Sequence, residues 1–538
     1  MPGFRERGYS SRLFGRDGVY WLDRKQWLYW TGLNREKTGA VMSILRIISS
    51  LPFRSTASAS LAVLLLSFST TAVAADEKPV NAAELFDYAR LWDVRIHISE
   101  DSFRGLEPKQ VRGFDRDFPY VEATVEIAGH PSLKVALRYK GNSSYSSARD
   151  TKKKSFKVDF NRIIEKQKFL GLTKLNLNNN ILDPSQVRET LAYRMFNNLG
   201  LPSCRTAFAK VYLEIEGRSG EEYLGLYTMV EQVNGSFLQE RFGTRDGLLL
   251  KPERSNSFPH LGDEWSDYER VYVPKTEAGA GFAGRLIEFT RFVEESEDKE
   301  FAEKISGYVD IPELMKFTAL HAVLAHLDSF LLRGHNFYIY LPRSDGRFRW
   351  LPWDVNSTFA GHRSAGSAAQ QTDLSIAHPY IESVKLISRI MKIQSVRAEY
   401  YKQVKAILAG PFKSETITGE MNKLRGVISA AVSKDSNTDF KRFVANFTGT
   451  GGGKETDQPK PPPRQREPGR GGMQQKPLLA DFIAARTSAI LSQLSEGREG
   501  YVPRSSRRGS RGDRGAGSGQ NARRPSRGPF PRRPAPGN

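Results

Sequence analysis

Acidic and amide side chains recur at short intervals in the second half of the 538-residue chain, and their types suit phosphoryl transfer. Asp328 closes an apolar, helix-like stretch, Asn336 heads a strand-like segment, and Asp354 ends the next one. We expect these two segments to pair as a hairpin, which would bring the three side chains to one mouth. Phosphoryl transfer needs a carboxylate that accepts the hydroxyl proton, and oxygen ligands for Mg²⁺. The sequence therefore predicts Asp328 as the base and Asn336 and Asp354 as Mg²⁺ ligands, with Asn356 as a helper at the metal.

An earlier group of residues is of the kind that binds a nucleotide. The segment 141–146 is a small polar loop, and its backbone amides, including those of Gly141 and Ser143, could approach phosphates. A run of three lysines that ends at Lys154 leads into a strand-like segment, where Lys154 shares a face with two apolar side chains. We therefore expect Lys154 to point inward and to clamp the nucleotide. A solvated strand entry is the alternative, and the choice among the lysines of 152–157 stays open.

Two further segments complete this group. A helix is expected to begin at Ser185 as N-cap, and it carries Arg188 and Glu189 in its first turns. Glu189 is the predicted partner of the clamping lysine, and Arg188 could reach a phosphate, although a surface pair is the alternative reading. The buried strand-like segment 223–231 ends in an acid, Glu231, and resembles a hinge that offers hydrogen bonds to adenine.

These residues depend on an expected order of strands and helices. The expected strands are 94–98, 120–127, 133–139, 155–160, 208–214, 223–231, 247–251, 336–341 and 347–352. The expected helices are 185–199, 237–242, 311–332, several between 381 and 432, and 478–494. The first half is therefore rich in strands and the second in helices, which predicts an α+β fold.

Six ordered segments of the chain resemble the successive blocks of the CotH (spore coat protein H) kinase family. They read RYKGNSS, KKSFKVDF, LDPSQVRETLAYRMFNNLGLP, YLGLYTMVEQVN, HNFYIY and WLPWDVN. The similarity runs from about Leu85 to Leu494. Asn356 stands where the family often has a second acid, and the segment 449–475 looks peculiar to this chain.

The resemblance implies an atypical protein-kinase-like fold, with a β-rich N-terminal part that holds one helix and a helical C-terminal part. It also implies the use of ATP with Mg²⁺ or Mn²⁺. The expected reaction transfers the γ-phosphate to Ser or Thr of secreted, coat or envelope proteins. The implied roles fit Asp328 and Asp354 best, because their blocks match best.

The ends of the chain predict export. A basic start after Met42, an apolar run at 61–68 and the small residues 72–74 together resemble a signal peptide at 42–74. We expect residues 1–41 to be a start-site artefact or a disordered extension, and 75–499 to be the kinase-like domain. Within that domain 449–475 is an expected disordered insertion, and 500–538 is an expected disordered tail. A secreted, periplasmic or envelope protein follows, without a transmembrane helix in the mature chain.

The charge distribution narrows the partners. The net charge of +20 is concentrated at the ends, with ten Arg against one Asp in 500–538. The central region is close to balanced, and the tail has few aromatic residues for base stacking, so nucleic acid is disfavoured. The tail could instead bind an anionic polymer. The single cysteine, Cys204, excludes an internal disulfide and a Cys-rich zinc site.

Two readings of function stay open. In the first, the chain is an active, exported ATP-dependent protein kinase that acts on a secreted or coat-type protein. In the second, it is a noncatalytic kinase-like assembly protein of the envelope or coat, whose basic tail binds polyanions. ATP is scarce outside the cytoplasm, which favours the second reading. The presence of both Asp328 and Asp354 favours the first.

Overall fold

The computed structural model describes residues 12–15, 18–21, 78, 80–112, 115–253, 258–332, 334–362, 364–450 and 476–504. The chain divides into two compact units, Met1–Glu77 and Lys78–Asn538. In the first unit, β1 (Arg12–Gly15) and β2 (Gly18–Trp21) pair as an antiparallel hairpin. The predicted signal peptide at 42–74 lies outside the described residues. So do the predicted insertion and tail, apart from residues 449–450 and 500–504.

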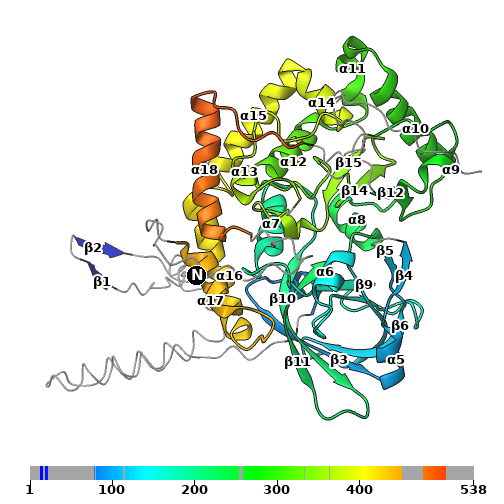
Figure 1. Cartoon of the computed structure of the whole chain (residues 1–538), viewed down its shortest axis with the longest axis vertical. Coiled ribbons are helices and arrows are strands. Elements are labelled where there is room, and N and C mark those ends of the chain that lie inside the picture. The colour runs from blue at the N-terminus through cyan, green and yellow to red at the C-terminus, as the bar shows by residue number, and fades with distance from the viewer. Residues whose placement is uncertain are drawn as a thin grey trace, which may run out of the picture. The chain divides into compact units, whose positions relative to one another are not determined.

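A closed β-barrel forms the strand-rich part of the second unit (Figure 1). Its order is β10-β11-β9-β8-β7-β6-β3, and every neighbouring pair is antiparallel except β10 and β3, which run parallel. The strands are β3 (Leu91–Ile98), β6 (Val121–Ile127), β7 (Leu133–Tyr139), β8 (Phe156–Asp159), β9 (Lys174–Asn178), β10 (Thr206–Ile215) and β11 (Glu222–Glu231). Alternate residues of a strand point to opposite faces, so each strand gives one apolar face to the barrel interior. Phe156, Val158, Leu175 and Leu177 occupy that interior.

Short elements decorate the barrel. They are α4 (Ala82–Leu85), α5 (Glu100–Gly105), the hairpin of β4 (Lys109–Arg112) with β5 (Asp115–Asp117), and α6 (Asn142–Ser147). The loop expected at 141–146 is wrong, because this segment is helical in α6. Gly141 permits the sharp entry into α6, since its φ of 80° lies in the region that glycine adopts most readily.

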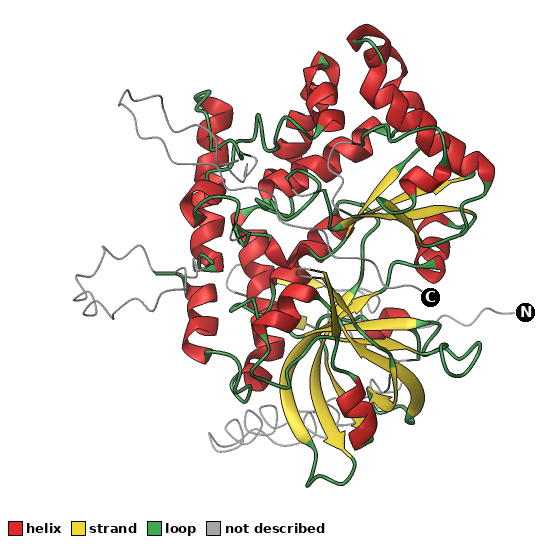
Figure 2. Cartoon of the chain, turned by 45° about the vertical axis from the view of Figure 1, so that its right-hand side comes forward, coloured by secondary structure: helices red, strands yellow, loops and turns green. Residues whose placement is uncertain are grey.

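The remaining elements build a mainly helical part around a four-stranded sheet (Figure 2). The sheet has the order β13-β12-β14-β15, with β12 (Gly247–Pro252), β13 (Tyr272–Pro274), β14 (Phe337–Pro342) and β15 (Arg349–Pro352). The helices are α7 (Arg188–Asn198), α8 (Gly235–Phe242), α9 (Trp265–Tyr268), α10 (Ala280–Glu295), α11 (Asp298–Lys304), η1 (Ile305–Gly307), α12 (Ile311–Val323), η2 (Val355–Ser357), α13 (Ala368–Thr372), α14 (Lys385–Lys392), α15 (Gln394–Ala409), α16 (Ser414–Val432), α17 (Phe440–Thr448) and α18 (Leu479–Ser495). The second unit is thus a mixed α+β structure, as expected. No helix among the described residues is long and apolar enough to cross a membrane.

Two expected helices have different bounds. The helix expected at 311–332 ends at Val323, because Ala325 adopts a left-handed φ of 46° that interrupts it. Asp328 consequently lies in an irregular segment rather than at a helix end. The helix expected to be capped by Ser185 starts at Arg188 instead. There, the backbone N–H of Arg188 donates to Oδ2 of Asp183 at 2.9 Å, so an acid five residues upstream satisfies the helix start.

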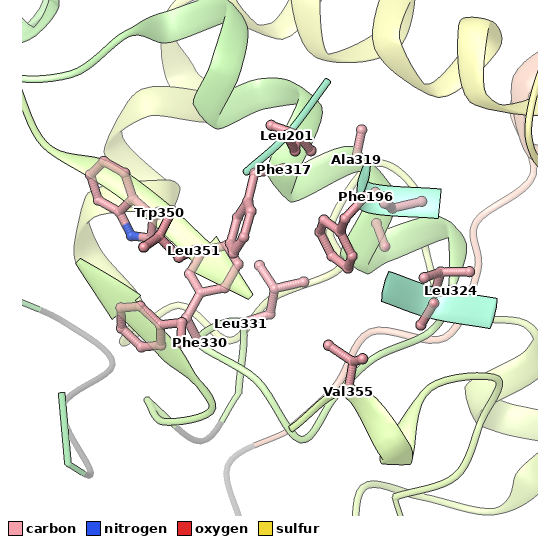
Figure 3. Close-up of a cluster of buried hydrophobic side chains, with 14 of the residues drawn as sticks. Phe196, Leu201, Phe317, Ala319, Leu324, Phe330, Leu331, Trp350, Leu351 and Val355 are labelled. Carbon is pink, nitrogen blue, oxygen red and sulfur yellow. The ribbon is translucent and has the colours of Figure 1, made fainter. Parts of the chain in front are cut away.

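Two apolar cores support these parts. One fills the barrel, and the other joins α7 to α12, α15, α16, α18 and the four-stranded sheet. Figure 3 shows part of the second core, in which Phe196 of α7 and Phe317 of α12 pack near Leu324, Leu331 and Val355. Leu324 and Leu331 lie within four residues of Asp328, and Val355 directly follows Asp354. The core therefore fixes the backbone on which these two acids stand.

Candidate active site

A polar pocket lies where the end of β7 and the end of β9 face α7 and the segment after β15. The residues that line it are Lys140, Gly141, Ser144, Ser155, Asn178, Asn179, Asn180, Ile181, Leu182, Asp183, Glu189, Asp354, Asn356 and Lys476. The pocket thus collects both cations and carboxylates from distant parts of the chain.

Lys140 is the basic residue that the barrel contributes to the pocket. Its Nζ donates to Oδ1 of Asn178 at 2.7 Å, and the amide of Asn178 donates to both carboxylate oxygens of Glu189, at 3.0 and 2.8 Å. Burial lowers the pKa of Lys140, while the charges of Asp354 and Glu189 oppose that shift. Burial, together with the charge of Asp354, raises the pKa of Glu189 to about 7.

Asp354 stands directly after β15 in a left-handed conformation, with φ of 51°. Its backbone N–H donates to the hydroxyl of Tyr193 on α7 at 3.0 Å, and Oδ1 accepts from Nδ2 of Asn356 at 2.6 Å. Burial raises the pKa of Asp354, and the charge of Asp328 adds to that shift while Lys140 opposes it. Asp328 is therefore near Asp354, although it is not among the residues that line the pocket.

Asp328 is held by two histidines. Its Oδ1 lies 2.9 Å from Nε2 of His335 and 3.5 Å from Nδ1 of His362. Burial opposes the charge of Asp328, but the hydrogen bond from His335 and the nearby imidazoles outweigh it and hold the pKa of Asp328 below its usual range. Asn336 does not direct its amide nitrogen at a carboxylate. That nitrogen donates to the backbone carbonyl of Asp328 at 2.8 Å.

Left-handed backbone conformations gather around these residues. Asn180, Asn336 and Asp354 have φ values of 53°, 62° and 51°. Such conformations cost energy in residues other than glycine and concentrate at functional sites. Their presence in the pocket wall and beside Asp328 supports a functional role for this region.

Several predicted residues lie outside the pocket wall. Nζ of Lys154 donates to the backbone carbonyl of Ala148 at 2.6 Å and lies over the ring of Tyr145. Arg188 is fully buried and pairs with Asp183 at 2.6 Å, so it does not extend into the pocket. Ser143 is exposed on α6. These three residues do not line the pocket that holds Glu189, Asp354 and Asn356.

The predicted hinge segment is also engaged elsewhere. The strand β11 has barrel neighbours on both sides, β10 and β9, which use its backbone hydrogen-bonding groups. At its end, the backbone N–H of Glu231 donates to the carbonyl of Arg205 at 3.0 Å. The carboxylate of Glu231 is buried between Arg205 and Arg241, at 2.5 and 3.0 Å. The hinge interpretation of 223–231 is therefore not supported by its placement.

The position of Lys154 away from this pocket has a physical cause. Alternation along the strand correctly grouped Lys154 with the apolar side chains, but in a closed barrel that face points into the barrel and not into the pocket. The pocket uses the opposite, polar face. Lys140 and Asn178 were missed for this reason, although polar residues at alternate positions of 138–140 and 174–178 mark that face in the sequence.

The donor set fits a divalent cation bound to phosphate. Burial and the charge of Asp354 raise the pKa of Glu189, and burial and the charge of Asp328 raise the pKa of Asp354, so a cation bound here would relieve repulsion among these acids. Carboxylate and amide oxygens are the donors that Mg²⁺ prefers. Among the described residues, no three His, Cys, Asp or Glu side chains form a metal-binding group by themselves.

Comparison with known proteins identifies the family. A family model described as "CotH kinase protein" matches residues 137–451, more than half of the chain. The chain belongs to this family, as the six sequence blocks predicted. It is also similar to Inner spore coat protein H of Bacillus subtilis (strain 168), with 23% identity over 354 residues, which cover 63% of this chain and 90% of that protein.

Proposed function

We propose that this chain is an ATP-dependent protein kinase with a protein-kinase-like two-part fold, in which the barrel and the helical part enclose the nucleotide. The observation that carries the proposal is the pocket itself. Lys140, braced through Asn178 by Glu189, faces the same space as Asp354 and Asn356, and Asp328 lies beside them. Phosphoryl transfer needs a cation that binds the phosphates, oxygen donors that hold a metal, and a carboxylate that takes the proton of the acceptor hydroxyl.

Each residue has a distinct role in this proposal. Lys140 takes over the role first assigned to Lys154 and binds the phosphates of ATP by a charge-assisted hydrogen bond. Asp354 and Asn356 hold Mg²⁺ or Mn²⁺, and Glu189 orients Lys140 through Asn178. The bound metal would neutralise charge on the phosphates. Asp328, kept ionised by His335 and His362, accepts the proton of the attacking hydroxyl.

Asn336 acts on the base in this proposal, not on the metal. Its amide holds the backbone carbonyl of Asp328, and its left-handed backbone places it at the head of β14. A role as metal ligand requires its carbonyl oxygen to turn toward Asp354. Four other residues were predicted to bind the nucleotide: Arg188, Glu231, Gly141 and Ser143. Of these four, Gly141 alone lines the pocket, and the proposal keeps a nucleotide contact for it alone.

The name of the similar protein supports a proposed substrate class and location. The similar protein in Bacillus subtilis is named an inner spore coat protein. We therefore propose that the acceptors are Ser or Thr residues of coat or envelope proteins and that the chain works at the coat or envelope. The signal-like segment 42–74 supports export. The basic segment 500–538 is proposed to retain the protein on anionic polymer.

A noncatalytic assembly role is the second candidate, and one observation favours it. The amide of Asn356 donates to Oδ1 of Asp354, an arrangement that occupies an atom needed for the metal. Binding of a metal requires the Asn356 amide to turn and present its oxygen.

Transfer of labelled phosphate tests the proposal. The full chain would be incubated with γ-labelled ATP, Mg²⁺ or Mn²⁺ and an extract of coat proteins, beside Asp354→Ala. Metal-dependent labelling of protein by the wild type, absent in the variant, is expected. If the protein binds MgATP but labels neither itself nor any protein of the extract, the assembly role is favoured.

A further inference from the structure

The ring of Trp353 lies beside the ammonium of Lys140. Nζ of Lys140 stands over this ring, 5.5 Å from its centre. Lys140 follows β7 of the barrel, whereas Trp353 follows β15 of the helical part and directly precedes Asp354. The contact therefore joins the proposed phosphate-binding lysine to the residue before the proposed metal ligand, although the two lie more than 200 residues apart in the chain.

The position of Trp353 is fixed by two neighbours. Its backbone N–H donates to the carbonyl of Asn336 at 3.1 Å, which continues the pairing of β15 with β14 by one step. Its ring packs against the ring of Tyr338 in a T-shaped arrangement, with centroids 5.4 Å apart and an interplanar angle of 86°. Tyr338 is itself buried on β14. The ring of Trp353 is thus held by the four-stranded sheet before it contacts the barrel.

Lys140 contacts groups that carry no formal charge. Among the described residues, its ammonium makes one hydrogen bond, to Oδ1 of Asn178 at 2.7 Å, and it takes part in no ion pair. An aromatic ring attracts a cation through the negative potential of its face, without neutralising it. A carboxylate in direct contact would compete with phosphate for the ammonium. An amide and a ring instead hold the lysine in place and leave its charge to the ligand.

We propose that Trp353 is a positioning residue, whose ring holds the ammonium of Lys140 where it meets the phosphates of ATP. The inference rests on the proposed function and adds to it a residue that does not itself line the pocket. Trp353 acts through Lys140 and not by stacking on the base of the nucleotide. Because Asp354 directly follows it, one short segment sets the positions of the lysine and of the metal ligand relative to each other.

Calorimetric titration of the full chain tests this role, with MgATP, inorganic tripolyphosphate and adenosine as probes. Trp353→Leu is expected to weaken binding of MgATP and of tripolyphosphate by about 3- to 10-fold, the loss of one cation–π contact. Trp353→Phe keeps an aromatic face and should retain most of the affinity. Adenosine binding should be unchanged in both variants. An equal loss for adenosine would overturn the inference, because Trp353 would then bind the base.

A double-variant cycle separates a positioning role from a structural one. If Trp353 acts through Lys140, Trp353→Leu should cause no further loss of MgATP affinity when Lys140 is already replaced by Met. If the two losses instead add as free energies, Trp353 does not act through the lysine, and the inference is overturned. A lower melting temperature with unaltered MgATP affinity in Trp353→Leu would overturn it as well.

Tryptophan fluorescence tests the contact without a ligand and without the Leu variant, should that variant fail to fold. Lys140→Met removes a positive charge beside the indole, so it should shift the emission of the otherwise unaltered chain. The shift should be absent when Trp353 is replaced by Phe. It should persist in the control Trp265→Phe, which removes a partly buried tryptophan of α9. An equal shift in both backgrounds would overturn the inference.

The two proposals fail in distinguishable ways. Binding of MgATP by the wild type, together with unaltered affinity in Trp353→Leu, would reject the role of Trp353 and leave the kinase proposal standing. If the wild type binds neither MgATP nor tripolyphosphate, both proposals are rejected.

Discussion

The ammonium of Lys140 and the carboxylate of Glu189 meet on one side chain, the amide of Asn178, which accepts from the first and donates to the second. Asn178 is the last residue of β9, and Lys140 directly follows the last residue of β7. The strand β8 lies between these two strands and runs antiparallel to both, so β7 and β9 end on the same side of the barrel. The bridge therefore ties the polar face of the barrel to α7. It also keeps Lys140 near two acids, Glu189 and Asp354, whose charges oppose the lowering of its pKa by burial.

Replacing Lys140 and Lys154 separately should show which face of the barrel binds the nucleotide. Lys140→Met is expected to weaken MgATP binding by about 10- to 100-fold, because it deletes a charge-assisted contact to phosphate. Lys154→Met should leave that affinity within about threefold, since its ammonium is bound to the Ala148 carbonyl and not to the pocket. Titration of both variants with MgATP measures this. A larger loss in Lys154→Met would restore the first assignment.

Replacement of Asp354 and of Asp328 should affect MgATP binding and phosphate transfer differently. Asp354→Asn removes a formal charge at the proposed metal site with little change in volume, so MgATP affinity and transfer should fall together, each by at least about tenfold. Asp328→Asn should lower turnover by about 10²–10⁴-fold and leave nucleotide affinity largely unchanged, because a base acts mainly in the transition state.

Separate measurements of binding and single-turnover transfer test this pair of variants. Circular dichroism and melting temperature confirm that both variants fold. Equal loss of affinity in Asp328→Asn and Asp354→Asn would contradict the division of roles. It would indicate instead that both acids hold the metal.

The sequence predicted the bounds of the strands better than it predicted which face of a strand meets the pocket. The alternating segments gave β7, β8, β10 and β11 with bounds close to those observed, and the hairpin of β14 and β15 placed Asn336 and Asp354 near Asp328. These features depend on local periodicity and turns, which the sequence carries directly. Closure of the barrel is not local, and it decides which face of a strand meets the pocket.

The same limitation explains Arg188 and Lys476. Arg188 looks like a surface or phosphate-binding residue in the sequence, but besides Asp183 it donates to Asn446 and Pro477, which lie more than 250 residues away. Lys476 follows a segment of low complexity that gives no periodic signal. Contacts between parts so distant in the chain require the fold itself, and no spacing rule links them.

A buried ion pair should hold the barrel to the helical part. Nζ of Lys153 lies 2.5 Å from Oδ2 of Asp435, in the turn between α16 and α17, and both side chains are almost fully buried. Asp435→Ala leaves the lysine without its partner and should lower the free energy of unfolding by about 3–5 kcal/mol. The double variant Lys153→Met with Asp435→Leu should recover part of that loss.

Recovery is expected to be partial, because Asp435 also accepts from the backbone N–H of Leu226 at 3.2 Å. Urea unfolding of the two single variants and the double variant measures the coupling. If the losses of unfolding free energy in the two single variants simply add up in the double variant, the ion pair does not join the barrel to the helical part.

Lys157 should make stability rise with pH. It lies on the polar face of the barrel, where Nζ donates to Oε1 of Gln232 at 2.7 Å. Burial is the main cause that lowers its pKa to about 6, and the charges of Lys140, Arg138 and Lys174 add to the shift, while Asp159 opposes it. Between about pH 6 and its ordinary pKa of 10.5, the unfolded chain therefore holds a proton at Lys157 that the folded chain lacks. Proton release on folding favours the folded state as pH rises.

The free energy of unfolding should accordingly rise by up to about 1.4 kcal/mol per pH unit more in the wild type than in Lys157→Met, which cannot release this proton. Urea unfolding at intervals from pH 6.5 to 8.5 gives both slopes. The control is Lys423→Met, which removes an exposed lysine of α16 paired with Glu420 and should follow the wild type. Parallel lines for the wild type and Lys157→Met would show that Lys157 is charged in the folded protein. In that case Lys157 adds one more positive charge to this face of the barrel, beside Lys140, Arg138 and Lys174.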